Sequence, residues 1–260
     1  IVRNENTYLG GTIFAGGWCY DGKEFVRTEL PIHADLLWNK GSLRADEGIR
    51  IINHHELVEI CTDKWKTFGL FSHHCPLTKI VPSRNRLKTA LREMGEARIV
   101  AKPIEGGEGE GVMIGTAEEV AEAPHSYPLM LQEFIDTSGG VPGIVEGVHD
   151  FRLFIVRGDI ASSYVRTPPT GSLVANVAQG GSEIPVAAAA IPEGAMAVFT
   201  DVDSALAHFD NRIYSIDMGL DRRTGQWKII ELNAMPGPPS PAAPDYASFL
   251  EKITDALLLS

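Results

Sequence analysis

The 260-residue sequence lacks several features that would point directly to a common class of protein. Three cysteines are present, Cys19, Cys61 and Cys75, and their odd number and wide spacing argue against a disulfide framework and indicate a reducing compartment. No uncharged apolar run approaches the roughly 18 residues of a membrane span. Positive charge is scarce too, because the net charge is −11, which disfavours nucleic acid or an anionic membrane as a partner. We therefore expect a soluble cytoplasmic protein whose anionic ligands meet local positive charge.

Two familiar nucleotide-binding loops are also missing, and the first residues do not have a leader pattern, although a chain that begins without methionine can already be trimmed. Residues 1–10 have neither the basic start nor the apolar core of a signal peptide. The glycine spacing fits no dinucleotide fingerprint. Gly17–Lys23 approaches the phosphate-loop pattern GxxxxGK[ST], but Glu24 stands where a hydroxyl is required, and Asp21-Gly22 is typical of a hairpin turn.

The residue pattern predicts alternating strands and helices without repeats. Asn53, followed by Glu56, is expected to cap a first helix that carries Lys64, and Ser83 is expected to cap a second. Residues 167–185 are expected to form a loop. The strands expected from alternation and apolar runs are 12–15, 24–28, 99–102, 112–114, 129–135, 150–156, 160–166, 213–220 and 226–232, and the expected helices are 57–68, 83–94, a short one from 117, 195–209 and 246–259.

The most specific chemistry lies in the expected hairpin of residues 213–233. Side chains alternate along a strand, so Glu231 and Asn233 share one face, and a turn centred on Thr224 places Asp217 opposite Glu231. Opposed carboxylates repel, and a hard divalent ion such as magnesium would compensate them through oxygen ligands. The alternative is that Arg222, Arg223 or another basic group neutralises the pair. We predict the metal site, since the two arginines sit in the turn.

A second group of residues suggests a phosphate-binding flap. Lys102 ends an apolar strand, and a run of glycines follows whose backbone amides can approach phosphates: Gly106, Gly107, Gly109 and Gly111. Taken alone, such a run is as often a mobile surface loop. Arg152 and Arg166 lie on the next two expected strands, where arginine offers fixed donors for phosphate oxygens, although a lone strand arginine often has no role.

The order of these features resembles the ATP-grasp superfamily, and within it the glutathione synthetase branch and the ligases that add glutamate to a ribosomal-protein tail. The resemblance runs from about Ile51 to Pro238. Its most specific parts are Asn53 with Thr62-Asp63-Lys64, Val100-Ala-Lys102-Pro with the glycine loop, Gln132-Glu133-Phe134-Ile135, Asp150-Phe-Arg152, Asn176 with Gly180-Gly181, and Asp217 with Glu231-Leu-Asn233-Ala-Met-Pro-Gly.

The resemblance implies an α+β ATP-grasp fold, with two α+β lobes and the nucleotide between them, and it implies ATP and two Mg²⁺ ions, or Mn²⁺ in their place, as cofactors. Arg152 and Arg166 would hold the transferring phosphate and the acyl phosphate. The metal ligands would be Asp217, Glu231 and Asn233. The nucleotide would be bound by Lys64 and Lys102 at the phosphates, by the flap glycines Gly107, Gly109 and Gly111, by residues 132–136 at adenine and ribose (Gln132, the backbone of Glu133 and Phe134, Ile135 and Asp136), and by Asn176 near magnesium or phosphate.

The sequence also departs from the family. Only about fifty residues precede the resemblance, and we therefore expect part of the acceptor site to be absent or to be supplied by another subunit, as in a homo-oligomer. Glu108 and Glu110 lie in the flap, and their charges would have to point outward or meet an amine.

The expected division is a shortened leading region at 1–52, an N-terminal lobe with the flap at 53–135, and a C-terminal lobe with the magnesium site at 136–260.

The leading functional hypothesis is an ATP-dependent ligase that joins a small-molecule or peptide carboxylate to an amine through an acyl phosphate, releasing ADP and phosphate. The alternatives are a kinase on the same scaffold and a nucleotide-binding module without turnover. His54-His55 and His73-His74-Cys75, with Cys61 between them, match no standard zinc spacing, so we expect these residues to serve packing or loop placement.

Overall fold

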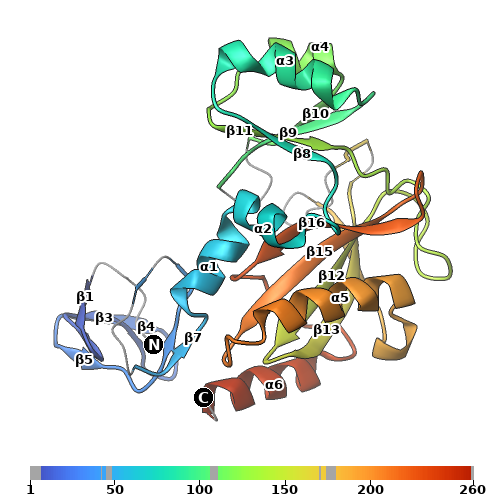
Figure 1. The fold of residues 1–260 in the computed structure, drawn as a ribbon. Helices are drawn as coiled ribbons and strands as arrows, with labels where there is room; N and C mark the ends of the chain where they lie inside the picture. Colours follow the sequence, from blue (N-terminus) through green and yellow to red (C-terminus); the bar gives the residue numbers. More distant parts are fainter. Residues whose placement is uncertain are drawn as a thin grey trace.

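The computed structural model describes residues 7–41, 43–44, 49–105, 111–169, 171–173 and 180–258. Three groups of β-strands follow one another along this part of the chain and lie in different regions of the molecule (Figure 1). The first group belongs to a leading region, the second forms a four-stranded sheet, and the third forms a five-stranded sheet. None of the described helices has both the length and the apolar character needed to cross a membrane.

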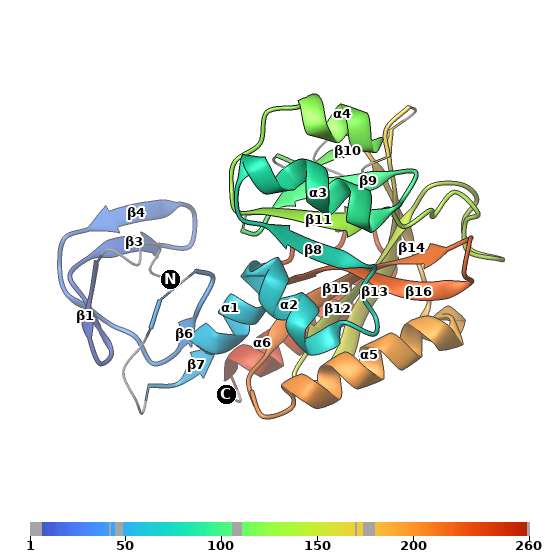
Figure 2. The same cartoon turned by 45° about the horizontal axis from the view of Figure 1, so that its top comes forward.

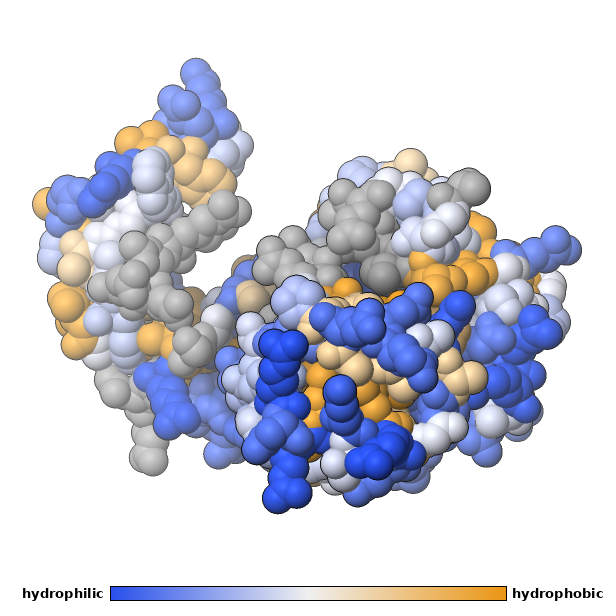
Figure 3. All heavy atoms as spheres, turned by 90° about the horizontal axis from the view of Figure 1, so that it is seen from above, coloured by the Kyte–Doolittle hydropathy of each residue, from blue (hydrophilic) through white to orange (hydrophobic). Residues whose placement is uncertain are grey.

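The leading region is built from short strands in three small sheets. A three-stranded sheet has the order β1-β2-β5, β3 and β4 form a two-stranded ribbon, and β6 pairs in parallel with β7. The hairpin turn predicted at Asp21-Gly22 is confirmed, since Tyr20 pairs with Phe25. Figures 2 and 3 show most of this region standing apart from the rest of the molecule, whereas β6 and β7 lie beside α1 and contribute Trp38 and Ile52 to a cluster with Phe249 of the C-terminal helix. The strands are β1 Tyr8–Gly10, β2 Ile13–Phe14, β3 Gly17–Tyr20, β4 Phe25–Thr28, β5 Ile32–His33, β6 Leu37–Trp38 and β7 Ile51–Ile52.

The second group is an antiparallel sheet of order β10-β9-β11-β8, and helices α3 and α4 cover its outer face (Figure 2). Leu87 and Leu91 of α3 pack with Val120 of α4 and with buried residues of the sheet. We refer to this unit as the upper lobe. Its elements are β8 Thr78–Val81, α3 Arg84–Met94, β9 Ile99–Pro103, β10 Met113–Gly115, α4 Ala117–Glu122 and β11 Leu129–Glu133.

The third group is the five-stranded antiparallel sheet β14-β13-β12-β15-β16, which we call the lower sheet. Residues of α1, α2 and α5 share one hydrophobic core with one face of its central strands, and α6 packs against the other face through Phe249, which contacts Phe154 at an aromatic centroid distance of 4.8 Å. The elements are α1 His55–Thr62, α2 Lys64–Phe71, β12 Asp150–Val156, β13 Asp159–Thr167, β14 Ser182–Pro185, the 3₁₀ helix η3 Ala188–Ala190, α5 Glu193–Leu206, β15 Ile213–Asp221, β16 Gln226–Asn233 and α6 Tyr246–Leu258.

Alternation along β12 divides the α6-facing side of the lower sheet into two halves. Phe154 and Val156 belong to the apolar cluster under α6, and Asp150 and Arg152 occupy the same face further along the strand. On β15 the same rule places Asp217 beyond Ile213 on that face. The strands therefore carry a charged half next to an apolar half, and the charged half forms the candidate site.

Several local expectations were wrong at the first helices. The single helix expected at 57–68 is two helices, α1 and α2, because the side chain of Asp63 caps α2 by accepting hydrogen bonds from the amides of Trp65 and Lys66. Asn53 is not the cap of α1, since His54 occupies that position. Instead, Asn53 has a φ of +63° and its buried side chain bonds the backbone of β15 and of Ala234.

Two further differences concern Ser83 and the long loop. Ser83 precedes α3 as expected but makes no capping hydrogen bond, because its hydroxyl donates to Oδ1 of Asn85 at 2.5 Å. The expected loop 167–185 ends in strand β14, which pairs with β13. The helices α1 and α2, which the expected division assigns to the N-terminal lobe, pack instead with the core of the lower sheet.

Candidate active site

The centre of the candidate site is an ion pair across two neighbouring strands. Arg152 on β12 pairs directly with Asp217 on β15 in the sheet register. Its guanidinium donates from Nε to Oδ1 at 2.6 Å and from Nη2 to Oδ2 at 2.5 Å, a bidentate arrangement that fixes both planar groups. Both side chains are buried. Their orientation is thus set by the β-sheet rather than by a loop.

A second arginine extends this pair into a network. Arg166 on β13 lies opposite Asp150 on β12, and it donates to both oxygens of that carboxylate, at 2.7 and 2.5 Å. The same Nη2 donates to Oδ2 of Asp217 at 2.6 Å. Asp150 was not among the expected site residues, although its two-residue spacing from Arg152 places both on one strand face and could have identified it.

Two lysines approach the site from other elements. Glu231 on β16 lies opposite Asp217, as predicted, and its Oε1 is 3.6 Å from Nζ of Lys64 at the start of α2. Lys102, at the end of β9 in the upper lobe, is 6% exposed and donates to the backbone carbonyl of Ile230 at 3.4 Å. The site therefore lies where the upper lobe meets the edge of the lower sheet.

Burial and charge together set the pKa values here. Burial alone raises the pKa of Asp217, but the charges of Arg152 and Arg166 more than offset this and hold it below its ordinary value. Burial also raises the pKa of Asp150, to about 7, and the neighbouring Asp217 charge adds to the rise. For Glu231, burial raises the pKa although Lys64 opposes the change. Burial lowers the pKa of Lys102 to about 8.

The predicted opposition of Asp217 and Glu231 is confirmed, but the structure compensates the two charges without a metal. Arg152 and Arg166 pair with Asp217, and Lys64 pairs with Glu231. Basic groups thus offset the repulsion between the carboxylates, as the alternative held, but they do so at a buried position rather than on the solvated face that the alternative assumed. The cations are those of the neighbouring strands and helix rather than the turn residues Arg222 and Arg223.

The donor set nevertheless fits magnesium chemically. Asp217, Glu231 and Asn233 offer carboxylate and amide oxygens on adjacent strands, which are the ligands this hard cation prefers. Both oxygens of Asp217 accept hydrogen bonds from arginine, and Oδ1 of Asn233 accepts from the Met235 amide at 2.7 Å. Oδ2 of Asp217 accepts two of these hydrogen bonds and Oδ1 only one, so Oδ1 keeps a lone pair with which it could bind a metal ion.

The segment expected to contact adenine begins in the last two residues of β11, continues beyond the strand, and is tied to the β15–β16 turn. Arg223 donates to Oε1 of Glu133 at 2.7 Å and to the carbonyl of Phe134 at 2.9 Å, and Arg222 lies 3.7 Å from Oδ2 of Asp136. The amides of Glu133 and Phe134 already donate to the carbonyls of Leu77 and Arg98. Those two amides are thus engaged within the protein, and the reading of adenine by backbone groups of Glu133 and Phe134 stays a prediction.

The structure describes some of the other residues expected to bind the nucleotide, and the remaining ones lie outside the described ranges. Gln132 is buried and donates to the hydroxyl of Thr78 at 2.9 Å, while Ile135 follows β11. Gly111 has a φ of +68°, and a Cβ there would lie 2.9 Å from Cγ of Pro103. Five flap positions named above and one residue expected near magnesium or phosphate lie outside the described residues: Gly106, Gly107, Glu108, Gly109, Glu110 and Asn176.

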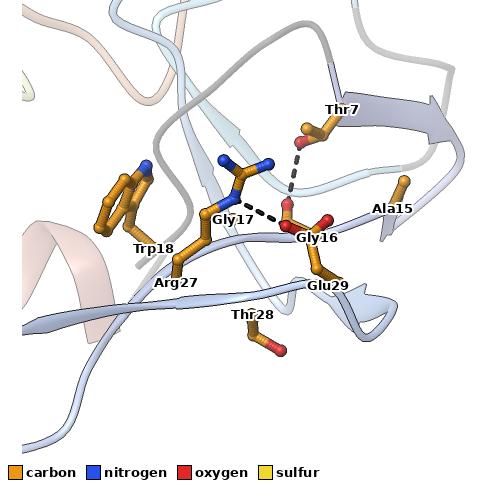
Figure 4. Close-up of a pocket in the computed structure, with 8 residues that line it drawn as sticks. All are labelled: Thr7, Ala15, Gly16, Gly17, Trp18, Arg27, Thr28 and Glu29. Carbon is orange, nitrogen blue, oxygen red and sulfur yellow. Dashed lines mark hydrogen bonds and ion pairs between the residues drawn. The ribbon is translucent and has the colours of Figure 1, made fainter.

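A cavity of about 150 Å³ lies away from this site, in the leading region (Figure 4). The hydroxyl of Thr7 donates to the carbonyl of Gly16 at 3.0 Å, and Arg27 pairs with Glu29 at 2.7 Å. Both charged side chains are largely exposed, and none of the expected site residues lines the cavity. It therefore contributes nothing to the charged site.

Part of the sequence matches a known domain family, and the fold is similar to that of solved ligases. Residues 61–162 match the sequence model of the ATP-grasp domain family. The structure is similar to that of D-alanyl-alanine synthetase A from Vibrio cholerae, with a TM-score of 0.65 and 12% identity over 90% of this chain and 79% of that chain. An ATP complex of D-alanine–D-alanine ligase from Bacillus anthracis gives a TM-score of 0.54, at 16% identity over 82% of this chain and 72% of that chain. The resemblance predicted from the motifs is confirmed, and the protein has the ATP-grasp fold.

Several relatives share part of this sequence. A "Probable alpha-L-glutamate ligase" of Parasynechococcus marenigrum is 30% identical over 144 residues, covering 52% of this chain and 29% of that relative. Proteins of the same name from Thioalkalivibrio sulfidiphilus and Psychromonas ingrahamii are 25% and 26% identical, over 73% and 80% of this chain and 61% and 70% of their own lengths. The chain thus spans less than two thirds of the first two of these relatives.

Proposed function

We propose that this chain carries the nucleotide and metal site of an ATP-dependent ligase that joins a carboxylate to an amine, with an acyl phosphate as intermediate and ADP and phosphate as products. The observation that carries the proposal is the charged junction between the upper lobe and the lower sheet. There, two lysines and two arginines meet three carboxylates, and each side chain is held by a strand or by a helix start. The names of the sequence relatives support the same class of reaction.

Charge balance supports a nucleoside triphosphate with metal ions as the ligand. The four cations exceed the three carboxylates by one positive charge, whereas a triphosphate brings about four negative charges. The junction alone cannot balance such a ligand. Magnesium held by Asp217, Glu231 and Asn233 would supply the missing positive charge, two ions being the number that we propose.

Each residue of the junction has a role in this proposal. Lys64 and Lys102 bind phosphate oxygens, and both already lie beside β16. Arg152 and Arg166 exchange Asp217 for the oxygens of the transferring phosphoryl group, because their bidentate donors suit carboxylate and phosphate alike. Asp150 keeps Arg166 in place during this exchange, since it accepts two hydrogen bonds from that guanidinium.

The chemistry then follows two displacements. An oxygen of the substrate carboxylate attacks the terminal phosphorus, the bond from that phosphorus to the bridging oxygen breaks, and ADP leaves with the electron pair. The amine nitrogen next attacks the acyl carbon, the phosphate leaves, and the nitrogen loses a proton. The protein contributes positioning and positive charge rather than covalent catalysis in both steps.

Trapping the intermediate tests the proposal. The purified chain is incubated with ATP, magnesium, hydroxylamine and panels of amino acids, dicarboxylates and peptides, and acyl hydroxamate and ADP are measured. We expect both products, and a loss of about 100-fold or more in Glu231→Gln. The matched control is Glu93→Gln, which removes the charge of an exposed carboxylate paired with Lys79 at 2.7 Å.

Other outcomes would replace this function. AMP and pyrophosphate would exclude an acyl phosphate and point to an adenylate. A stable phosphorylated product that forms without any amine would identify a kinase. ATP binding with no ADP formation across the panel would identify a nucleotide-binding module, or a chain that needs another subunit or segment to complete its acceptor site.

A further inference from the structure

A second group of metal-ligating side chains lies outside the charged junction. His73 and His74 belong to the connection between α2 and β8, and Asp201 lies on α5, far along the chain. Nε2 of His74 is 2.8 Å from Oδ2 of Asp201, and Nε2 of His73 is 3.8 Å from the same oxygen. The two imidazole centroids are 4.1 Å apart. Both rings thus direct a nitrogen to one carboxylate oxygen.

The backbone holds this arrangement in place. The carbonyl of His74 accepts a hydrogen bond from the amide of Ile229 on β16 at 2.8 Å, and the His74 amide donates to the carbonyl of Phe71 at 2.9 Å. The His74 side chain is only 16% exposed, against 62% for His73. Helix α5, which carries Asp201, packs on the same sheet core as α2. The two segments therefore bring their side chains together on a rigid base.

The donor set selects a class of metal different from magnesium. One ligand atom from each of the three residues lies within 4.8 Å of the others, close enough for small side-chain rotations to bring all three onto one ion. Two imidazole nitrogens and a carboxylate oxygen suit zinc and its neighbours in the first transition row, whereas magnesium prefers oxygen ligands alone. An ion pair accounts for His74, but it leaves His73 beyond hydrogen-bonding distance from the shared oxygen.

We propose that His73, His74 and Asp201 form a binding site for a divalent transition-metal ion such as zinc. The ion crosslinks the α2–β8 connection, which leads into the upper lobe, to helix α5, which packs on the same face of the lower sheet as α1 and α2. Solvent completes the coordination, because two of the three ligands are more than half exposed. The proposal is independent of the ligase function, since it uses none of the residues of the charged junction.

The cysteines that accompany these histidines in the sequence do not join the site. Cys61 and Cys75 are both buried, and the described metal-ligating groups contain neither. The sequence predicted packing or loop placement for the local histidine and cysteine residues, and the proposal departs from that prediction for His73 and His74. What the spacing missed is Asp201, which only the packing of α5 brings beside them.

Zinc titration of the untagged chain tests the site. Calorimetry with zinc chloride alone should show binding that weakens by at least about tenfold in His73→Ala and in Asp201→Asn. The matched control is His54→Ala, because His54, His55 and Glu56 form a similar group from consecutive residues at the start of α1. Zinc should also raise the melting temperature of the wild type, and raise it less in the two site variants.

Copper gives a second readout that does not depend on stability. With one equivalent of Cu²⁺, nitrogen hyperfine splitting in the electron paramagnetic resonance spectrum should report two imidazoles in the wild type and one in His73→Ala. His73 is exposed, so the variant is expected to fold normally, which circular dichroism verifies. Absence of zinc binding at millimolar concentration would overturn the proposal. Equal affinity in the site variants, or a loss confined to His54→Ala, would overturn it as well.

Discussion

Replacing Lys102 by methionine should make the protein more stable at neutral pH. The ammonium group is buried, and burial, helped by the charge of Lys64 and opposed by that of Glu231, lowers the pKa from 10.5 to about 8. Keeping this lysine charged at pH 7 therefore destabilises the folded state. The difference between the pKa values of the unfolded and folded states corresponds to a loss of about 3 kcal/mol in the free energy of unfolding at and below pH 7.

The sign follows from proton binding. Between pH 8 and pH 10.5 the unfolded chain holds the Lys102 proton and the folded chain does not, so wild-type stability gains from rising pH through this window. Lys102→Met has no such gain. The difference in free energy of unfolding between Lys102→Met and the wild type should therefore be largest at pH 7. There the variant should be more stable by about 2 kcal/mol, because it also loses the hydrogen bond to Ile230. The advantage should shrink by about 2 kcal/mol by pH 9.5.

Urea unfolding at pH 7 and at pH 9.5, followed by tryptophan fluorescence, measures this difference. Leu131→Met is the matched control, because Leu131 is buried on β11, next to β9, and carries no titrating group. Its effect should be the same at both pH values. A Lys102→Met variant that is less stable than the wild type, or a difference that does not change with pH, would refute the reasoning. The variant should also lose nucleotide affinity under the proposed function.

Two further substitutions probe the framework of the site. Asn53→Ala removes three buried hydrogen bonds to backbone groups and leaves a non-glycine residue at positive φ. We therefore expect the free energy of unfolding, measured by urea denaturation, to fall by about 3 kcal/mol. A decrease below about 1 kcal/mol would contradict this expectation. Gly194→Ala places a Cβ 2.5 Å from Cδ1 of Trp227, so α5 must shift. We expect a lower melting temperature, equivalent to a loss of about 1 to 3 kcal/mol in stability, and altered Trp227 fluorescence. An unchanged melting temperature would contradict this expectation.

The period of two along a strand was enough to predict the central pairing of the site. Because the residues between Asp217 and Glu231 form one hairpin, their register follows from the turn and from alternation, both of which are local. Even a bulge at Ile230 did not displace the pair. Strands β12 and β13 were predicted nearly to the residue for the same reason.

The partners of these carboxylates could not be predicted in the same way. Arg152 pairs with Asp217 at a separation of 65 residues, and which strands become neighbours depends on how the whole sheet is ordered. The sequence suggested that the charges needed a metal, whereas the sheet order supplies two arginines. The role of Asn53 was missed similarly, since its contacts on β15 lie 160 residues away.

By itself, then, the sequence determined most of the strands and helices, the ATP-grasp resemblance and the opposed carboxylates, because period, turn chemistry and motif order act over short stretches of chain. Only the tertiary structure decided which cation meets which anion, which backbone amides after β11 are engaged, and that Asp201 joins two histidines. Those contacts join segments that become neighbours only when helices and sheets bury their apolar faces together, and no local pattern encodes that arrangement.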